Sequence, residues 1–432
     1  MPAGRPPRWQ ARNGQRRLEG PRLGIVKVSV VKDNSGFSLL KQTVIDRGLC
    51  TGCGTCASVC PRQLIEFRYV DGEPEPHLAE ASCSDCTLCF DTCPGQDVPM
   101  LAMEAMAFGT ARNPGTDEFG IYRKCFIAHA GDEMLRQAGG SGGSVSAILA
   151  YALDTGLVDA AIVTGFSRTA PYRPEPKLVT HSKELSSCAR SKHGGAVPTN
   201  SLLHRAVVDD GMSKLAMVGL PCHVHGVRKV QLLRRPGRIA RSVGLVLGLF
   251  CGSQFYFEAT RHLLLEWCGL KSLDEVAMID YRWGDWPGGF YVRTTDGREL
   301  RIDRFDYTFH KFISYVRDRC TVCIDHGAEL ADISFGDYWY PGCQVGDPGW
   351  NVVLVRSDAG MRVLEAAVES RYLVAQEAST DQIARSGREV KRHSNPFRAG
   401  QRRRYGMPVP DFGFTLGHEP QPEPQRHTMP RR

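Results

Sequence analysis

Sixteen of the 432 residues are cysteines, and half of them form two blocks of identical spacing. The first block reads CTGCGTCASVCP and the second CSDCTLCFDTCP, so both follow C-x2-C-x2-C-x3-C-P. Three closely spaced thiolates can wrap one face of a [4Fe–4S] cluster, and in two-cluster ferredoxins the fourth cysteine ligates the other cluster. We therefore predict one cluster on Cys50, Cys53, Cys56 and Cys93, and a second on Cys83, Cys86, Cys89 and Cys60.

Two alternatives to clusters are weaker for these blocks. A tetrahedral zinc site needs four ligands and has no use for a repeated three-plus-one block that ends in proline. Disulfides suit short secreted chains, whereas the basic N-terminus of this chain lacks the apolar segment of a secretory signal. We expect reduced, metal-bound thiols in a cytoplasmic protein. Two adjacent clusters carry single electrons and bind no substrate, so a further site must lie elsewhere in the chain.

Four of the other cysteines could form a third quartet. Cys222 and Cys251 follow predicted buried strands, and strand ends in α/β domains are where sites assemble. Cys320 and Cys323 form a Cys-x-x-Cys pair with no second pair beside it. A thioredoxin-type dithiol would need Cys320 at a helix start after a strand, but HKFISYVRDR before it reads as helix or loop. The four thiols suit a third cubane or a structural zinc, and three others could replace one ligand: Cys188, Cys268 and Cys343.

A run of glycine and serine lies just before a predicted helix, in QAGGSGGSVSAILAYAL. It spans Gly139 to Ser144. Bare backbone at a helix N-terminus suits a phosphate or the edge of a flavin. The run matches neither the G-x-G-x-x-G fingerprint nor a Walker A loop, so a plain flexible loop is an equal interpretation.

A second candidate surface is YRWGDWPGGF at residues 281–290. One interpretation is a substrate-side rim, where Arg282 faces an anionic coenzyme and Trp283 or Trp286 stacks on a ring. The alternative, which we favour, is a Gly-Pro turn with partly buried tryptophans.

The elements that must position these residues alternate between strands and helices. Short apolar runs predict buried strands, and amphipathic stretches between them predict helices. We predict strands at 159–165, 214–220 and 242–252, helices at 144–156, 221–235 and 254–269, and a hairpin at 290–302 with its turn at Asp296-Gly297. The fold class is therefore α/β with α+β elements, in which part of the sheet is antiparallel. The order of the parallel strands does not follow from these patterns.

The chain divides into four regions: a disordered basic arm at 1–24, a two-cluster ferredoxin domain at 40–105, a larger α/β domain at 120–400, and a disordered tail at 405–432. The net charge of +7 lies mainly near the two ends. We interpret it as solubilising, with attraction of an acidic partner or anionic coenzyme as a weaker interpretation. No nucleic-acid partner is expected. No apolar run is long enough to span a membrane.

Six motifs follow one another in an order that resembles a known family. They are GGSGGSVSAILAYALDTGLVDAAIVTG, ARSKHGGAVPTNSLL, MVGLPCHVHGVRKVQ, GLVLGLFCG, CTVCIDHGAELADISFGDYW and WNVVLVRSDAG. Over residues 120–360 the chain resembles the coenzyme F420 hydrogenase/dehydrogenase beta-subunit family, to which a ferredoxin module is often attached. The resemblance implies a bound FAD, a [4Fe–4S] cluster in the flavoprotein domain, and electron exchange with a partner. The family's cysteine motifs coincide with Cys222, Cys251, Cys320 and Cys323.

The resemblance also implies which residues surround the flavin. The family's Ser-Gly-Gly loop corresponds to Gly140, Ser141, Gly142, Gly143 and Ser144. Its Ser-Lys-Tyr stretch corresponds to Ser191, Lys192 and His193, where histidine replaces the usual tyrosine. A surface lysine is an equal interpretation of Lys192. Hydride transfer requires no side chain as acid or base, so the catalytic residue is unknown.

Family members use several substrates. The best known reduce or oxidise coenzyme F420, and others of similar build reduce the 8-vinyl or 7-hydroxymethyl group of chlorophyll precursors. A flavin can connect one-electron clusters to a two-electron carrier. We therefore expect an oxidoreductase that links a small-molecule redox coenzyme, most simply coenzyme F420, to an electron-transfer partner such as ferredoxin or a hydrogenase or dehydrogenase subunit. The alternatives are a chlorophyll-precursor reductase and a non-enzymatic subunit of a larger complex. An oligomer is compatible with either.

Overall fold

The structure is a computed structural model that describes residues 35–79, 83, 86–114, 116–303, 312–339, 348–380, 391 and 394–414. The basic arm predicted at 1–24 and Cys343 lie outside these residues. All described residues belong to one compact unit, Asn34–Arg432, so the ferredoxin module and the larger domain are not separated into two units. Within the described part of the chain, no helix combines the length and apolarity needed to cross a membrane.

An eight-stranded sheet forms the centre of the larger domain, in the order β13-β3-β12-β11-β7-β6-β4-β5. The four strands β11, β7, β6 and β4 are parallel, while the strands on either side pair antiparallel. The prediction of a mixed α/β fold is therefore confirmed. The strands are β3 (Lys124–Ala130), β4 (Ala160–Phe166), β5 (Pro174–Val179), β6 (Leu215–Gly219), β7 (Val243–Leu249), β11 (Ile333–Asp337), β12 (Asn351–Val355) and β13 (Leu373–Glu377).

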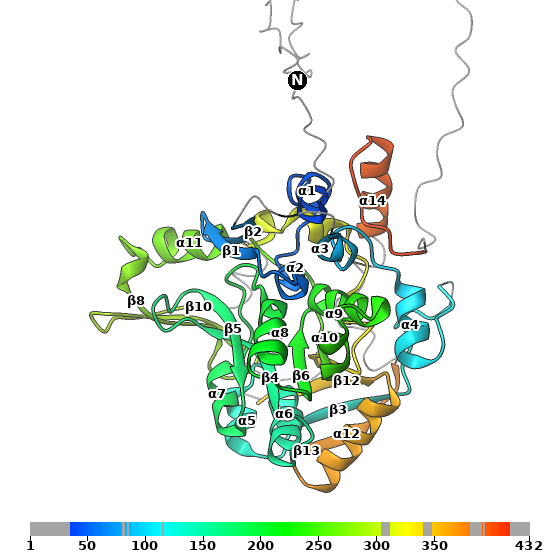
Figure 1. The fold of residues 1–432 in the computed structure, drawn as a ribbon. Helices are drawn as coiled ribbons and strands as arrows, with labels where there is room; N and C mark the ends of the chain where they lie inside the picture. The colour runs from blue at the N-terminus through cyan, green and yellow to red at the C-terminus, as the bar shows by residue number, and fades with distance from the viewer. Residues whose placement is uncertain are drawn as a thin grey trace, which may run out of the picture. The chain divides into compact units, whose positions relative to one another are not determined.

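Helices cover both faces of this sheet, because successive side chains of a strand point to opposite faces. In β4, Ala160 and Ile162 join one hydrophobic core, whereas Ala161 and Val163 join another. The first core includes side chains of α8 (Leu202–His204), α9 (Pro221–Leu233) and α10 (Gly237–Ser242). The second includes α6 (Ser144–Asp154), α7 (Leu185–Cys188) and α12 (Asp358–Glu369), which lie in the lower part of Figure 1.

A smaller antiparallel sheet consists of β8 (Val276–Trp283), β9 (Gly289–Thr294) and β10 (Glu299–Asp303). The predicted hairpin is confirmed, since β9 pairs with β10 and Gly297 adopts the positive φ of +88° that such turns need. The helix predicted at 254–269 begins at Phe257 instead. It is α11 (Phe257–His262), continues as a π-helix, η5 (Leu263–Trp267), and packs its apolar side on this sheet.

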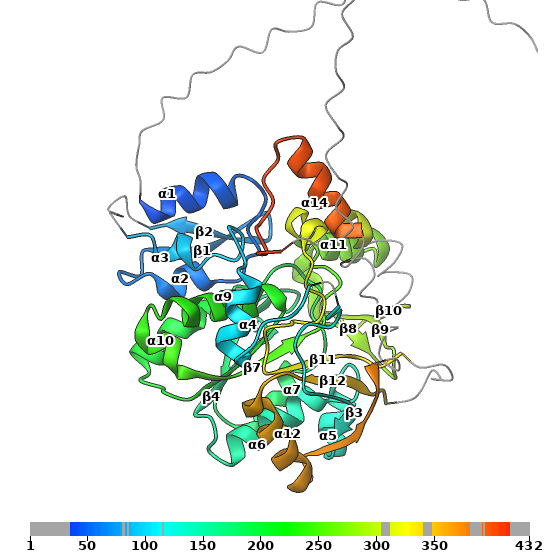
Figure 2. The same ribbon diagram turned by 90° about the vertical axis from the view of Figure 1, so that its right-hand side faces the viewer.

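The ferredoxin module packs directly on helix α9, as Figures 1 and 2 show from two sides. Its elements are α1 (Gly36–Leu40), η1 (Lys41–Ile45), α2 (Thr55–Val59), β1 (Ile65–Val70), β2 (Glu73–Leu78), α3 (Leu88–Asp91) and α4 (Met100–Phe108). Gly226 of α9 lets α2 approach closely, because a Cβ at this position would lie 2.1 Å from Thr55 Oγ1. The two parts of the chain therefore share one core.

The structure describes part of the segment predicted as a disordered tail. Helix α14 (Asn395–Arg404) is followed by residues 405–414, which the structure describes, while 415–432 lie outside the described residues. Phe412 is buried, and the Asp411 carbonyl accepts a hydrogen bond of 2.6 Å from Val98 N–H. The prediction of a tail from residue 405 is wrong for this segment, because an apolar ring and a backbone bond attach it to the ferredoxin module.

The remaining elements are short connections. They are α5 (Glu133–Ala138), η2 (Ser182–Glu184), η3 (Thr199–Ser201), η4 (Arg205–Asp209), η6 (Leu273–Glu275), η8 (Phe312–Tyr315) and η9 (Asp318–Val322). Helix α6 and helix α9 confirm the helices predicted at 144–156 and 221–235, and Pro221 occupies the first turn of α9 as expected.

Candidate redox site

The cysteines of the first predicted quartet are neighbours within the ferredoxin module. The thiol of Cys56 has Cys53, Cys50 and Cys93 among its ionisable neighbours, and its burial raises its pKa. Burial likewise raises the pKa of Cys93 to about 12. Metal binding is the usual way to keep such a buried sulfur deprotonated, because a coordinating thiol loses its proton outright.

Backbone N–H groups point at sulfurs of this quartet. Gly52 N lies 3.4 Å from Cys50 Sγ, and Gly95 N lies 3.3 Å from Cys93 Sγ. Hydrogen bonds of this kind stabilise thiolates and tune the potential of an attached cluster.

The second predicted quartet surrounds a cavity. Cys89 has Cys83, Cys60 and Cys86 as ionisable neighbours, and burial raises its pKa to about 12. All four cysteines line one cavity, together with apolar side chains that include Leu64, Ile65, Leu78 and Leu88. A thiol-lined cavity with apolar walls fits a [4Fe–4S] cluster, whose ligands are thiolates.

Two cysteines of the third predicted quartet lie at the carboxyl ends of neighbouring parallel strands. Cys222 lies in the first turn of α9 after β6, and Cys251 lies two residues after β7. Cys222 has Cys251, Cys320 and Cys323 among its ionisable neighbours, and burial raises its pKa. Among the described residues no three His, Cys, Asp or Glu side chains converge as they would around a single ion. The thiols of each quartet interact electrostatically with one another.

Two of the three cysteines weighed as substitute ligands lie elsewhere, and the third, Cys343, is outside the described residues. Cys188 packs against the core under α6 and α12, and Cys268 packs against the smaller sheet. They behave as small apolar core residues, a common role for free cysteine.

A buried pair of side chains joins the two halves of the third quartet. His225 follows Cys222 by one helical turn, and Asp325 lies two residues after Cys323. His225 Nε2 and Asp325 Oδ2 are 2.8 Å apart, and the side chains are 1% and 0% exposed. Burial alone would raise the pKa of Asp325, but the hydrogen bond from His225 and the nearby charge of Lys391 lower it. The pair fixes α9 to the Cys-x-x-Cys loop.

Residues near the C-terminus complete the surroundings of this loop. Asn395, at the start of α14, donates from Nδ2 to the carbonyls of Cys320 and Cys323 at 2.8 and 2.7 Å. Lys391 Nζ lies 3.5 Å from Cys323 Sγ and 2.8 Å from the carbonyl of Asp325. Gln254 N lies 3.3 Å from Cys320 Sγ. None of these contacts was evident from the sequence.

The three quartets are neighbours in series. Cys89 of the second quartet is among the ionisable neighbours of Cys56 in the first. Cys53 of the first quartet is in turn a neighbour of Cys222 in the third. Asn200 bridges the last junction, because its Nδ2 donates to Thr55 Oγ1 and to the carbonyl of His223, each at 2.9 Å.

Two arginines of the segment before Cys320 also reach the ferredoxin module. Arg317 forms an ion pair with Glu73 and lies 3.5 Å from the carbonyl of Cys50. Arg319 Nη2 lies 3.3 Å from the carbonyl of Pro94. The loop that carries Cys320 and Cys323 is thus attached to both segments that supply the first quartet.

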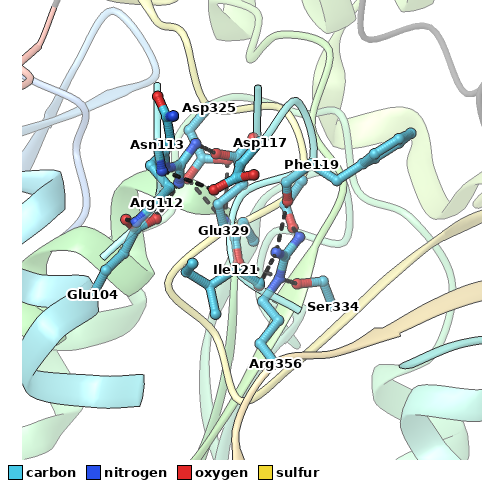
Figure 3. Close-up of polar contacts among 12 residues, drawn as sticks. Glu104, Arg112, Asn113, Asp117, Phe119, Ile121, Asp325, Glu329, Ser334 and Arg356 are labelled. Carbon is cyan, nitrogen blue, oxygen red and sulfur yellow. Dashed lines mark hydrogen bonds and ion pairs between the residues drawn. The ribbon is translucent and has the colours of Figure 1, made fainter. Parts of the chain in front are cut away.

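Figure 3 shows a buried charge network that includes Asp325, two residues after Cys323. Arg112 is bound between the carboxylates of Glu104 on α4 and Glu329. The backbone N–H of Glu329 donates to the carboxylate of Asp325 at 3.1 Å. Helix α4 of the ferredoxin module is therefore linked through charges to the loop that carries Cys323.

Arg356 of the same network is fully buried between three segments of the chain. Its guanidinium donates to the carbonyls of Phe119 and Ile121, each at 2.8 Å, and to Ser334 Oγ at 2.6 Å (Figure 3). Burial lowers the pKa of Arg356 to about 10. These bonds satisfy a charge that would otherwise be costly to bury.

The glycine loop is more engaged with protein than its sequence suggests. Gly142 N donates to the carbonyl of Pro348 at 3.2 Å, and Ser144 N donates to Asn351 Oδ1 at 3.1 Å. The expectation of bare backbone is wrong for these two groups, because the loop packs on the start of β12. Ser144 Oγ differs, since it is buried and has no hydrogen-bond partner among the described residues. An unpartnered buried hydroxyl beside a helix start fits a bound polar group.

The second predicted flavin segment lies beside this loop. Arg190, directly before Ser191, donates to the carbonyls of Ala138 and Gln137 at 3.2 and 3.1 Å and pairs with Asp280 at 2.8 Å. The structure therefore brings the two predicted segments together, through an arginine that the sequence did not single out.

Lys192 is not a surface lysine. Its Nζ donates to the carbonyls of Cys188, Ala189 and Arg190 at 2.7–3.0 Å, and burial lowers its pKa to about 8. All three donors of the amine are used within its own turn. His193 instead packs edge-on against Tyr281, with ring centroids 5.5 Å apart.

The segment at 281–290 is a turn with buried aromatic rings, as we favoured. Arg282 is 4% exposed and pairs with Asp337 at 3.0 Å, and it also donates to the carbonyl of Gly140. Its guanidinium binds Asp337 and the glycine loop, so the expectation that it faces an anionic coenzyme is wrong. Trp286 is buried, and Trp283 stacks on Tyr291 with ring centroids 4.3 Å apart.

Three protein-family models match the chain. Residues 125–204 match the N-terminal part, and residues 212–381 the C-terminal part, of the coenzyme F420 hydrogenase/dehydrogenase beta subunit. Residues 49–96 match the 4Fe-4S dicluster domain. The three matches cover every predicted cluster ligand.

Individual proteins resemble the chain over similar regions. It is 32% identical over 253 residues to coenzyme F420 hydrogenase subunit beta of Methanothermobacter thermautotrophicus, covering 58% of this chain and 83% of that protein. It is 27% identical over 336 residues to coenzyme F420-dependent sulfite reductase of Methanocaldococcus jannaschii, covering 75% of this chain but only 46% of that protein.

A solved structure shares the fold. A chain of the F420-reducing [NiFe] hydrogenase complex from Methanosarcina barkeri matches with a TM-score of 0.56 and 24% identity. The match covers 69% of this chain and 98% of the hydrogenase chain. It supports the assignment of a small ferredoxin-like part followed by a larger α/β domain.

Proposed function

Because this chain belongs to the coenzyme F420 hydrogenase/dehydrogenase beta-subunit family, we propose that it is an oxidoreductase that passes electrons between iron–sulfur clusters and coenzyme F420 through FAD. The observation that carries the proposal is the series of three cysteine quartets, in which Cys53 adjoins Cys222. Such a series gives electrons from the ferredoxin module a path into the α/β domain. The relatives named above are proteins of coenzyme F420 metabolism by name, which favours this coenzyme.

In this proposal each quartet holds one [4Fe–4S] cluster. The second quartet, around its cavity, is the outer end of the series, and the third is the inner end. The protein's own contribution is to fix the thiolates with backbone N–H groups, to exclude water by burial, and to keep the quartets adjacent. Residues of the third quartet are Cys222, Cys251, Cys320 and Cys323.

FAD is proposed to bind beside the glycine loop and the neighbouring segment at 191–193. A bound flavin would exchange single electrons with clusters and hydride with a deazaflavin. The unpartnered Ser144 Oγ supports this location, as does the approach of Arg190 to the end of α5. Lys192 shapes the segment by bonding its own turn and is not proposed to contact substrate.

The test is anaerobic purification followed by assay of iron, sulfide and flavin, and then stopped-flow mixing with reduced coenzyme F420. Three cubanes predict about twelve irons per chain, and the flavin should be reduced before the clusters. Eight irons would remove the third cluster. A flavin that stays oxidised on mixing would rule out coenzyme F420 as the substrate.

One observation favours a second candidate, an electron-transfer subunit without a substrate of its own. The chain corresponds to less than half of the sulfite reductase named above, so in that protein the matching region accompanies a further part of comparable size. A partner enzyme, whether a hydrogenase, a dehydrogenase or another reductase, would then supply the chemistry. A chlorophyll-precursor reductase has less support, since the hydrogenase and sulfite reductase relatives are named for coenzyme F420 instead.

A further inference from the structure

Lys391 is a buried lysine whose amine contacts a thiol of the third quartet. The residue is 2% exposed, and Nζ lies 3.5 Å from Cys323 Sγ. Cys251 and Cys320 are further ionisable neighbours of the amine. A lysine carries its charge into such a site only where negative groups compensate it.

This contact differs from those at the other two quartets. There the sulfurs receive backbone N–H groups, such as Gly52 N on Cys50 and Leu64 N on Cys60, each at 3.4 Å. Lys229 lies near Cys93, but its amine forms an ion pair with Asp97.

Lys391 has no such pairing in the described part of the chain. Its hydrogen bonds there go to Cys323 Sγ and to the carbonyl of Asp325. The carboxylate of Asp325 is itself held by His225. Among the contacts that the structure describes, the third quartet is therefore the one in which a sulfur accepts a hydrogen bond from a charged side chain.

We propose that Lys391 sets the reduction potential of the third cluster, raising it so that electrons arriving through the ferredoxin clusters collect there. The inference rests on the proposed third cluster. Net charge and hydrogen bonds to the sulfurs are two of the factors that set such potentials. A fixed positive charge in a site of low dielectric favours the state with one more electron. The step is a one-electron transfer from the first cluster to the third, in which no bond is broken and no proton moves.

The test compares Lys391→Met, Lys391→Gln and the exposed control Lys271→Met by anaerobic redox titration followed by EPR. Lys391→Met should lower the equilibrium constant for reduction of the third cluster at least tenfold, which is 59 mV for one electron. Lys391→Gln keeps a hydrogen-bond donor without the charge, so its shift should be smaller. Lys271→Met and the two ferredoxin signals should not move.

Two outcomes would overturn the inference. One is an unshifted third signal in both Lys391 variants while the wild type holds about twelve irons. The other is loss of about four irons from both variants, since Lys391 would then assemble the site rather than tune it. Eight irons in the wild type would instead show that the proposed third cluster itself is absent, and the inference would fall with it.

Discussion

The charge network of Figure 3 makes Arg112 the most informative single substitution. The side chain of Arg112 is 1% exposed and is bound by Glu104 and Glu329, which are 0% and 4% exposed. Replacing it by methionine keeps most of the volume but removes the cation. The two buried carboxylates then lose the cation that bound both of them, and Arg356 is the nearby charge that remains.

The expected cost follows from the two ways in which a carboxylate can respond. Removing one partner of a buried ion pair typically costs about 3–5 kcal/mol. A stranded carboxylate can take up a proton instead, which at pH 7 costs about 3.7 kcal/mol for a glutamate with an ordinary pKa of about 4.3. The two figures agree, so we expect Arg112→Met to lower the free energy of unfolding by about 4 kcal/mol at pH 7.

The same reasoning gives the sign of a pH dependence. Protonation is the cheaper response in acid, and at pH 5 it costs only about 1 kcal/mol. The penalty of Arg112→Met should therefore shrink as the pH falls from 7 to 5. Adding Glu104→Gln and Glu329→Gln should restore part of the lost stability at pH 7, because it removes both stranded charges.

The assay is chemical denaturation under anaerobic conditions, with unfolding monitored by circular dichroism. Arg68→Met is the matched control, since Arg68 pairs with Glu66 on the surface, where the side chains are 59% and 45% exposed. Such pairs contribute about 0–1 kcal/mol. A loss from Arg112→Met as small as that from Arg68→Met, or a loss that does not depend on pH, would refute the reasoning.

Three other substitutions test other parts of the molecule. Cys320→Ser should lose about four irons and keep both ferredoxin signals, whereas Cys268→Ser should keep all its iron; equal iron in the two proteins would contradict the ligand assignment. Gly226→Ala should destabilise the chain by about 1–3 kcal/mol in denaturation experiments, because its Cβ would collide with a hydroxyl of α2, while Gly244→Ala meets nothing within 4 Å and should be nearly neutral. As the pH rises from 8 to 10, the free energy of unfolding of the wild type should increase relative to that of Lys192→Met, by at most about 1.4 kcal/mol per pH unit. The reason is that the amine loses its proton at lower pH in the folded protein than in the unfolded chain. A difference that does not change with pH would argue against burial of the amine.

Local patterns were sufficient for much of the fold. The run KLAMVGL and the proline after it predicted β6 and the start of α9, because an apolar run and a proline in the first turn act locally. The same strand-end logic placed Cys222 and Cys251 at one edge of the sheet. Strand order did not follow, since β3, β11, β12 and β13 pair across long distances in the chain.

Buried charges were the larger omission. Arg112 and Glu329 are 217 residues apart in the sequence, and His225 and Asp325 are 100 apart. A charged residue reads as a surface residue until its partner is known, because only the pairing makes its burial tolerable. The error over Arg282 has the same origin, since Asp337 neutralises it from a different strand.

The position of the quartets along the chain has a consequence for biosynthesis. Both ferredoxin quartets are complete once Cys93 has been made, whereas the third waits for Cys323, 230 residues later, and for Asn395 beyond it. At about 5–20 residues per second, that interval lasts roughly 10–50 s. Under the proposed ligand assignment, a ribosome-bound chain can already carry two clusters while Cys222 and Cys251 stand as exposed, unligated thiols. The third site is thus the one most open to oxidation during synthesis, and the finished loop closes it.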